Sequence, residues 1–217
     1  MRFREITTMK SSFAVRLAYV LVCFTVVAHG GSKRATAADD FVPLFNGKDL
    51  TGWKTEGNWV VEEDGVLSLQ PREGESGWKR YHHYLWTEKQ YGDFVLELDF
   101  KLRGNSGVFF RVGDLAEPVK TGYEVQMLGK YSGSLIGIRG NFPDEGIYRP
   151  KEWNHLVLTV RGHVHIVVEV NGHKVNDVTA DGAKTRRPVK GYIGLQDHGQ
   201  PVSYRNIRIK ELDGGKK

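Results

Sequence analysis

Residues 191–212 read Gly191-Tyr192-Ile193-Gly194-Leu195-Gln196-Asp197-His198-Gly199-Gln200-Pro201-Val202-Ser203-Tyr204-Arg205-Asn206-Ile207-Arg208-Ile209-Lys210-Glu211-Leu212. The stretch contains two alternating segments, in which successive side chains face opposite ways, joined by a polar corner that ends in glycine. The corner carries an acid, an imidazole and, further on, a guanidinium. Strand alternation does not need such a cluster, so we take the corner as a candidate functional segment.

The same alternation continues along the chain. In residues 94–101 and 156–161, apolar side chains occupy every second position. The dipeptides Asp64-Gly65 and Asn171-Gly172 separate further strand-like segments, and they tolerate the positive φ angles that a two-residue hairpin turn requires. No sustained helical periodicity follows Phe41. Because a sheet with one apolar face must bury it against another sheet or close on itself, we expect an all-β, two-sheet β-sandwich of jelly-roll type.

The first 37 residues have the character of a secretory signal peptide. Basic residues precede an apolar run from Leu17 to Ala28, and Ala35-Thr36-Ala37 offers a cleavage site with small residues. The run is shorter than the roughly 20 residues that cross a bilayer, which disfavours the alternative of a permanent anchor. We therefore expect export, a domain over residues 38–212, a flexible tail over residues 213–217 and no stable membrane span. The final compartment and the oligomeric state stay open.

Charge and cysteine content narrow the function classes. The whole chain has a formal net charge of +5, but residues 38–217 contain equal numbers of basic and acidic residues. A nucleic-acid partner is therefore not expected, because it needs a basic patch on the folded domain. Cys23 lies in the leader, so the domain has no disulfide and no thiolate ligand. The histidines complete no metal-ligand pattern, so we predict no metal or cofactor; calcium held by loop oxygens stays an open alternative.

Several motifs occur in order along the domain. They are Leu44-Phe45-Asn46-Gly47-Lys48-Asp49-Leu50-Thr51-Gly52-Trp53, Asn105-Ser106-Gly107-Val108-Phe109-Phe110-Arg111, Gly122-Tyr123-Glu124-Val125-Gln126-Met127, Glu152-Trp153-Asn154 and the terminal stretch quoted above. Together these motifs resemble the 3-keto-disaccharide hydrolase domain family over about Phe41 to Leu212. The resemblance implies a concanavalin A-like jelly roll that acts on carbohydrates oxidised at C3, mostly in exported bacterial proteins.

The implied chemistry defines the side chains that the site needs. A ketone at C3 acidifies the proton on C2, so a base can remove that proton and the C1 substituent can leave by elimination, after which water adds to the enone. The route requires a base, an acid for the leaving oxygen and hydrogen-bond donors around the developing enolate. A conventional glycosidase would instead need two carboxylates flanking the scissile bond.

Strand parity predicts which groups converge. In residues 123–127, Glu124 and Gln126 face away from the apolar side chains, and in residues 108–112 the same rule places Arg111 opposite the apolar set. If these strands are neighbours, Arg111 and Glu124 line one concave surface. We predict Glu124 and His198 as general base or acid and Arg111 as the group that polarises the C3 ketone. The predicted substrate-binding residues are Asn105, Phe109, Gln126, Tyr148, Asp197 and Trp78.

Within this set, Phe109 is a candidate platform for a sugar ring, Asp197 orients His198 or binds hydroxyls, and Trp78 makes a rim contact. Other interpretations remain for some of these residues. Arg111 and Glu124 could form only a cross-strand ion pair, and Arg205 could brace the sandwich from inside. A non-catalytic glycan-binding module would have no essential base, and a structural component of the cell envelope would have no polar cleft.

Overall fold

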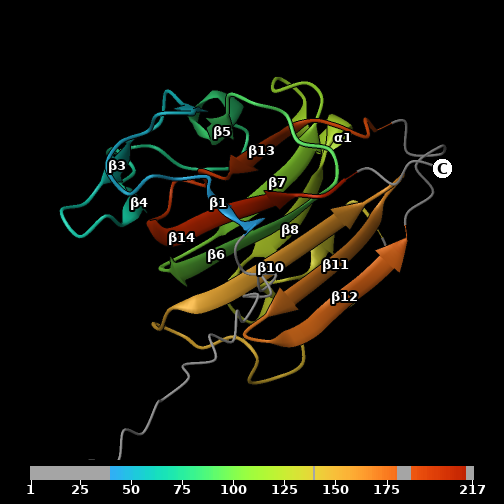
Figure 1. The fold of residues 1–217 in the computed structure, drawn as a ribbon. Coiled ribbons are helices and arrows are strands. Elements are labelled where there is room, and N and C mark those ends of the chain that lie inside the picture. The colour runs from blue at the N-terminus through green and yellow to red at the C-terminus, as the bar shows by residue number, and fades with distance from the viewer. Residues whose placement is uncertain (1–39, 139, 180–186, 214–217) are drawn as a thin grey trace, which may run out of the picture. The chain divides into compact units, whose positions relative to one another are not determined.

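The computed structural model describes residues 40–138, 140–179 and 187–213. The predicted leader and residues 214–217 of the predicted tail lie outside this part of the chain. The described residues form two antiparallel sheets, of eight and six strands, that pack face to face (Figure 1). This arrangement confirms the all-β, two-sheet jelly roll. No helix among the described residues is long and apolar enough to cross a membrane.

The first sheet has the order β12-β11-β10-β6-β14-β4-β3, and β1 pairs with another part of β14. Its strands are β1 Val42–Pro43, β3 Trp59–Val61, β4 Leu67–Leu69, β6 Phe94–Leu102, β10 Asn154–Arg161, β11 His165–Val170, β12 His173–Thr179 and β14 Val202–Glu211.

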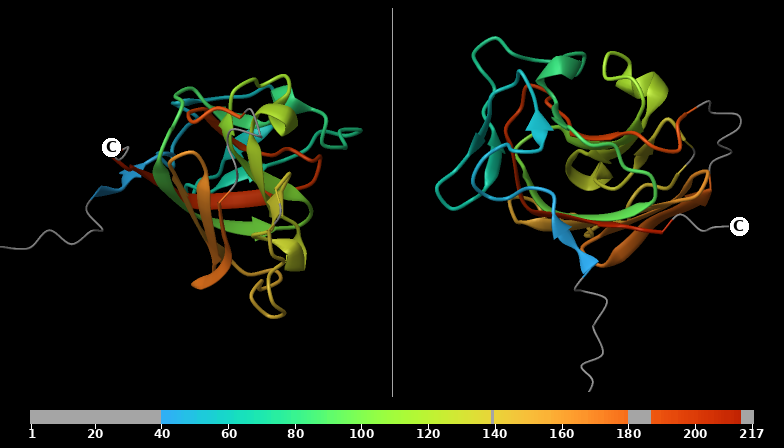
Figure 2. Two further views of the ribbon diagram at one scale, coloured as in Figure 1. Left: turned by 90° about the vertical axis from the view of Figure 1, so that its right-hand side faces the viewer. Right: turned by 45° about the horizontal axis from the view of Figure 1, so that its top comes forward.

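The second sheet has the order β2-β5-β13-β7-β8-β9. Its strands are β2 Trp53–Lys54, β5 Leu85–Thr87, β7 Ser106–Val112, β8 Tyr123–Met127, β9 Leu135–Ile136 and β13 Tyr192–Leu195. One short helix, α1 Pro118–Thr121, and two 3-10 turns, Tyr81–His83 and Gly129–Tyr131, complete the elements of the described residues. In the right-hand view of Figure 2, α1 and the turn at Tyr81–His83 lie on the same side of the second sheet.

The two predicted hairpins are confirmed. β3 pairs with β4 around Asp64-Gly65, and β11 pairs with β12 around Asn171-Gly172. Asn171 and Gly172 both have positive φ, of 52° and 78°, as a two-residue turn of this kind requires. The strands predicted from alternation at residues 94–101 and 156–161 also pair, as β6 and β10.

The two segments of residues 191–212 belong to different sheets. β13 pairs with β7 and β5 in the second sheet, whereas β14 pairs with β6 and β4 in the first. The polar corner between them therefore crosses from one sheet to the other at the edge of the core. Apolar side chains from both strands are buried in that common core, among them Ile193, Leu195, Tyr204 and Ile207.

A bulge in β14 changes the predicted position of Arg205. The pairing of β14 with β6 shifts between Arg205 and Arg208, and Asn206 has a φ of 54°. Because the bulge inserts a residue, Tyr204 and Ile207 are both buried while Arg205 faces outward. Its side chain is 41% exposed and pairs with Asp99, so the interpretation of Arg205 as an internal brace is wrong.

Candidate functional site

A second bulge, in β7, separates Arg111 from Glu124. In the pairing of β13 with β7, Gly194 lies opposite Phe109 but Tyr192 lies opposite Val112, and Arg111 has a φ of 51°. The inserted residue reverses the parity of the strand, so Arg111 turns toward the first sheet. Its guanidinium donates to the Gly162 carbonyl at 2.8 Å, to the Gly92 carbonyl at 3.2 Å and to the Asp93 carboxylate at 2.8 Å.

Arg111 is therefore fully buried at the loops that flank β6 and β10. Glu124 lies on the other face of the second sheet, because its neighbours Tyr123 and Val125 point into the main core. The prediction that Arg111 and Glu124 share one concave surface is wrong. So is the alternative that they form a cross-strand ion pair. The outer face of the second sheet, which carries Glu124, is called the Glu124 face below.

Glu124 is a buried carboxyl group without a partner. It is 8% exposed, and none of the described residues donates a hydrogen bond to its carboxylate. Burial raises its pKa from 4.5 to about 7, since desolvation disfavours the charged form and no nearby charge opposes it. A group with this pKa exchanges a proton readily at neutral pH, which is the property of a general acid or base.

Five aromatic side chains cover the Glu124 face beside this carboxyl group. Tyr84 stacks on Trp86 at 5.5 Å, and both pack against Phe109. Tyr81 makes an edge contact with Tyr84, and Trp78 lies 6.0 Å from Tyr81. Phe109 is only 1% exposed because the other rings cover it, so the predicted sugar platform at Phe109 is not accessible. Trp78 is 38% exposed, which fits the predicted position at the rim.

Polar groups from the corner after β13 and from the loop over residues 71–84 meet beside the aromatic side chains. Arg80 Nη2 donates to Asp197 Oδ2 at 2.6 Å and to His83 Nδ1 at 2.8 Å, and it lies 3.4 Å from Glu75 Oε2. Asp197 also accepts a hydrogen bond from the Gly199 amide at 2.7 Å. Asp197 therefore orients Arg80 and the turn at Gly199, whereas the sequence predicted that it orients His198 or binds sugar hydroxyls.

Burial shifts the pKa values of Asp197 and His83 in this cluster. Desolvation raises the pKa of Asp197 although Arg80 and the Gly199 amide oppose the rise, and desolvation together with the Arg80 charge lowers the pKa of His83. His83 is thus neutral at neutral pH, and its Nδ1 accepts from Arg80. The possible metal ligands Glu75, His83 and Asp197 lie within 4.8 Å of one another. However, the Arg80 guanidinium already places a positive charge among them.

The remaining predicted residues occupy different places. Gln126 faces the same side as Glu124, and its Oε1 accepts from the Met127 amide at 2.9 Å. His198 is half-buried in the polar corner, three residues after the end of β13. Tyr148 stacks on Phe100 at 6.5 Å and packs against the main core, so it does not join the Glu124 face. Asn105 precedes β7 at the edge of that face.

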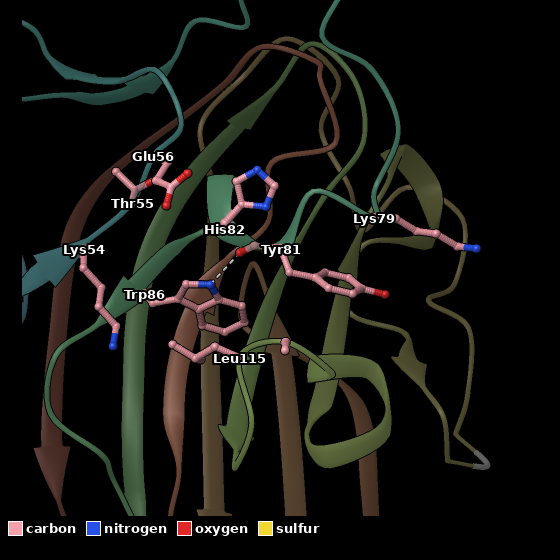
Figure 3. A pocket seen from close by; sticks show the side chains of 9 residues that line it. Lys54, Thr55, Glu56, Lys79, Tyr81, His82, Trp86 and Leu115 are labelled. Carbon is pink, nitrogen blue, oxygen red and sulfur yellow. Dashed lines mark hydrogen bonds between the residues drawn. The ribbon is translucent and has the colours of Figure 1, made fainter.

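A cavity of about 660 Å³ opens beside the aromatic cluster (Figure 3). Lys54, Thr55 and Glu56 line one wall, and Tyr81, His82 and Trp86 line another. In Figure 3 the Tyr81 ring extends away from Trp86, and its backbone carbonyl accepts a hydrogen bond from Trp86 Nε1 at 2.8 Å. The pKa of Tyr81 is raised by burial and, to a smaller extent, by the charges of Glu117 and Glu124. Tyr81 lines the cavity, whereas Glu124 does not.

The sequence reasoning missed Glu75, Arg80, His83, Tyr84 and Gln196 as members of the site. Four of these precede β5, in or just after the irregular link at residues 71–82, which showed no periodicity that could place them. The high density of charge and aromatic residues in that link was the available signal, because long loops on a rigid sandwich commonly carry binding residues.

Substitution of Gly194 by Ala should disturb the aromatic cluster. A Cβ atom at Gly194 would lie 2.2 Å from Trp86 Cζ3, so Trp86 must leave its stacked position over β13. We expect Gly194→Ala to lower the free energy of unfolding by about 2 kcal/mol, as overpacking does in a closed cluster. Chemical denaturation measures the change. Gly92→Ala is the matched control, because Gly92, like Gly194, has no positive φ, and a Cβ atom there would meet only the Val189 carbonyl oxygen at 3.7 Å.

Glu124 should also make stability depend on pH. Its folded pKa of about 7 lies above the unfolded value of 4.5, so ionisation costs stability as the pH rises from about 4.5 to 7 and no further above that. Glu124→Gln removes this cost. Its stability relative to the wild type should rise by about 3 kcal/mol between pH 4 and pH 8. Denaturation series at both pH values test this, with Glu63→Gln, an exposed carboxyl, as the control. A difference that does not change with pH contradicts the prediction.

The comparisons with known proteins agree with the architecture. Residues 40–210 match the family model of the 3-keto-alpha-glucoside-1,2-lyase-like domain. A 3-keto-disaccharide hydrolase from Bacteroides thetaiotaomicron is 24% identical over an alignment of 243 residues. The alignment covers 81% of this chain and 80% of that protein. The crystal structure of a candidate glycosyl hydrolase from Parabacteroides distasonis is 27% identical, with a TM-score of 0.59 and coverage of 81% and 95%. The carbohydrate-binding module CBM66 from Bacillus subtilis shares the fold, at 17% identity and a TM-score of 0.53.

Proposed function

The chain belongs to the family of 3-keto-alpha-glucoside-1,2-lyase-like domains, and from this premise we propose that it is an enzyme that cleaves 3-keto-glycosides. The substrate class comes from the family and from the curated relative, a 3-keto-disaccharide hydrolase. The observation that carries the proposal is Glu124, a buried carboxyl group without a hydrogen-bonding partner among the described residues and with a pKa of about 7. Export, which the predicted leader implies, belongs to the same proposal.

In the proposed reaction Glu124 removes the C2 proton. The electron pair of the C2–H bond moves to the C3 carbonyl and gives an enolate, and its return breaks the bond between C1 and the leaving oxygen. Water then adds across the enone, with its oxygen at C1 and a proton at C2. The substrate arrives already oxidised, so the route requires no redox cofactor. A carboxylate with a raised pKa suits the first step, because an ideal catalytic pKa lies near the working pH.

Other groups are proposed for the remaining steps. The Tyr81 hydroxyl stays protonated, because its pKa is raised, and it can donate to the developing enolate oxygen. His198, three residues after β13, remains the proposed acid for the leaving oxygen. Trp78 offers an exposed ring at the rim for a sugar to stack on. Arg111 is no longer part of this proposal, because it lies on the other side of the sheet.

The test compares two chromogenic glycosides that differ only at C3. The purified protein is incubated with p-nitrophenyl 3-keto-α-glucoside and with its unoxidised parent, and release of p-nitrophenolate is followed. We expect release from the keto compound alone, because only the ketone acidifies the C2 proton. Release from both compounds would indicate a conventional glycosidase. Release from neither, together with measurable binding of the parent, would favour a glycan-binding module.

A further inference from the structure

Two buried side-chain oxygens on the Glu124 face have no hydrogen-bonding partner among the described residues. They are Gln196 Oε1 and Asn105 Oδ1. Buried polar atoms in folded proteins are nearly always paired, so each unpaired atom needs an explanation. Both are acceptors, and both belong to residues that neighbour Gly107, which lies against the carboxyl group of Glu124.

The orientation of the Gln196 amide follows from its neighbours. The Tyr84 hydroxyl donates to the Trp78 carbonyl at 2.7 Å, so it has no second proton to give. Gln196 Nε2 must therefore be the donor in its 3.1 Å contact with the Tyr84 oxygen. This leaves Gln196 Oε1 as the unpaired atom, on a residue that is 4% exposed.

Gly107 is the common neighbour of the residues that carry these acceptors. The Gln196 amide nitrogen donates to the Gly107 carbonyl at 2.9 Å, so Gln196 lies beside Gly107 across the sheet. Asn105 lies two positions before Gly107, immediately before β7 begins. A Cβ atom at Gly107 would lie 2.4 Å from Glu124 Oε1. The missing side chain at Gly107 thus leaves room for the Glu124 carboxyl group, and Gln196 and Asn105 are neighbours of this glycine.

The two amide oxygens cannot satisfy each other, because neither has a proton to donate. A ligand that satisfies them must bring several donors on a compact frame. We propose that Asn105 Oδ1 and Gln196 Oε1 form a subsite that binds hydroxyl groups of a hexose ring, with C2 of the ring facing Glu124. The inference deepens the proposed function and relies on it only for the identity of the sugar.

The subsite is tested by binding, apart from catalysis. Calorimetry measures the affinity of p-nitrophenyl α-glucoside and of its 2-deoxy and 4-deoxy analogues for the wild type, Gln196→Met and Asn105→Ala. The wild type should bind at least one analogue about 10-fold more weakly than the parent, because a buried acceptor then loses its donor. Each variant should lose about 10-fold on the parent and bind the parent and the matching analogue equally, as in a double-mutant cycle.

Gln70→Met, at an exposed glutamine at the end of β4, is the matched control and should bind like the wild type. Melting curves identify a variant that fails to fold. If Gln196→Met does not fold, Asn105→Ala alone tests the subsite, and if Asn105→Ala does not fold, Gln196→Met alone tests it. Equal wild-type affinity for parent and analogues, retained discrimination in both variants, or no detectable binding of the parent overturns the subsite. Discrimination without cleavage of the keto compound would instead leave the subsite intact and remove the proposed reaction.

Discussion

Glu124→Gln is expected to reduce kcat on p-nitrophenyl 3-keto-α-glucoside by about 10³-fold while the protein remains folded. The amide keeps the size of the side chain but cannot accept a proton from C2. Burial also gives Glu124 a pKa of about 7, which suits a base that works near neutral pH. Binding of the unoxidised parent should change little, because a glutamine oxygen still accepts a hydrogen bond.

The pH profile distinguishes a base from a group that only shapes the site. If Glu124 acts as the base, kcat/KM should rise about tenfold per pH unit below its pKa and level off above about pH 7. The residual activity of Glu124→Gln should lose this limb of the profile. Glu63→Gln, at an exposed position, serves as the control and should keep the wild-type profile. Retention of more than a tenth of the activity by Glu124→Gln would contradict the assignment.

The fold was predictable because alternation in this chain is strong. Each face of β6 and β10 follows the period of two, and the turn dipeptides at Asn171-Gly172 and Asp64-Gly65 leave few other ways to connect the neighbouring segments. A sheet with one apolar face must bury it against another sheet or close on itself, and here the two sheets bury their apolar faces against each other. The all-β class therefore follows from local pattern and burial.

The position of Arg111 was not predictable from the same pattern. Val108, Phe110 and Val112 are all apolar, so the sequence shows no break in the alternation between them. A regular strand and a bulged strand would both bury these apolar side chains, because Val112 packs with Phe109 and Trp86 on the outer face as well as it would inside. The bulge is determined instead by contacts distant in sequence, from Arg111 to the loops at Gly92 and Gly162. Such contacts leave no periodic signal.

The arginine of the site comes from a loop for a related reason. Arg80 is positioned by Asp197, which is 117 residues away, and by Glu75 and His83 within its own irregular segment. The sequence showed that the link is rich in charge, and it showed that the corner at Asp197 is polar. The pairing between them depends on the strand order, which brings β5 and β13 together.

Glu124 and Arg111 are two buried charged residues with opposite environments. Arg111 makes hydrogen bonds to two carbonyls and a carboxylate, so its charge is compensated. Glu124 has no such compensation and shifts its pKa instead. Compensated buried charge maintains a structure, whereas uncompensated buried charge is retained where chemistry needs it. Replacement of Arg111 should therefore lower stability, whereas replacement of Glu124 should lower activity.

Arg111→Met should lower the free energy of unfolding by about 3 kcal/mol, because it removes the donors for the Gly92 and Gly162 carbonyls and the partner of Asp93. Chemical denaturation measures the loss. The activity of the folded fraction should stay near that of the wild type, since Arg111 lies behind the sheet that carries Glu124. Arg205→Met is the matched control. Its 41% exposed side chain also pairs with an aspartate, and it should cost less than about 1 kcal/mol. A stable but inactive Arg111→Met would return Arg111 to the catalytic group and contradict the placement that the β7 bulge gives it.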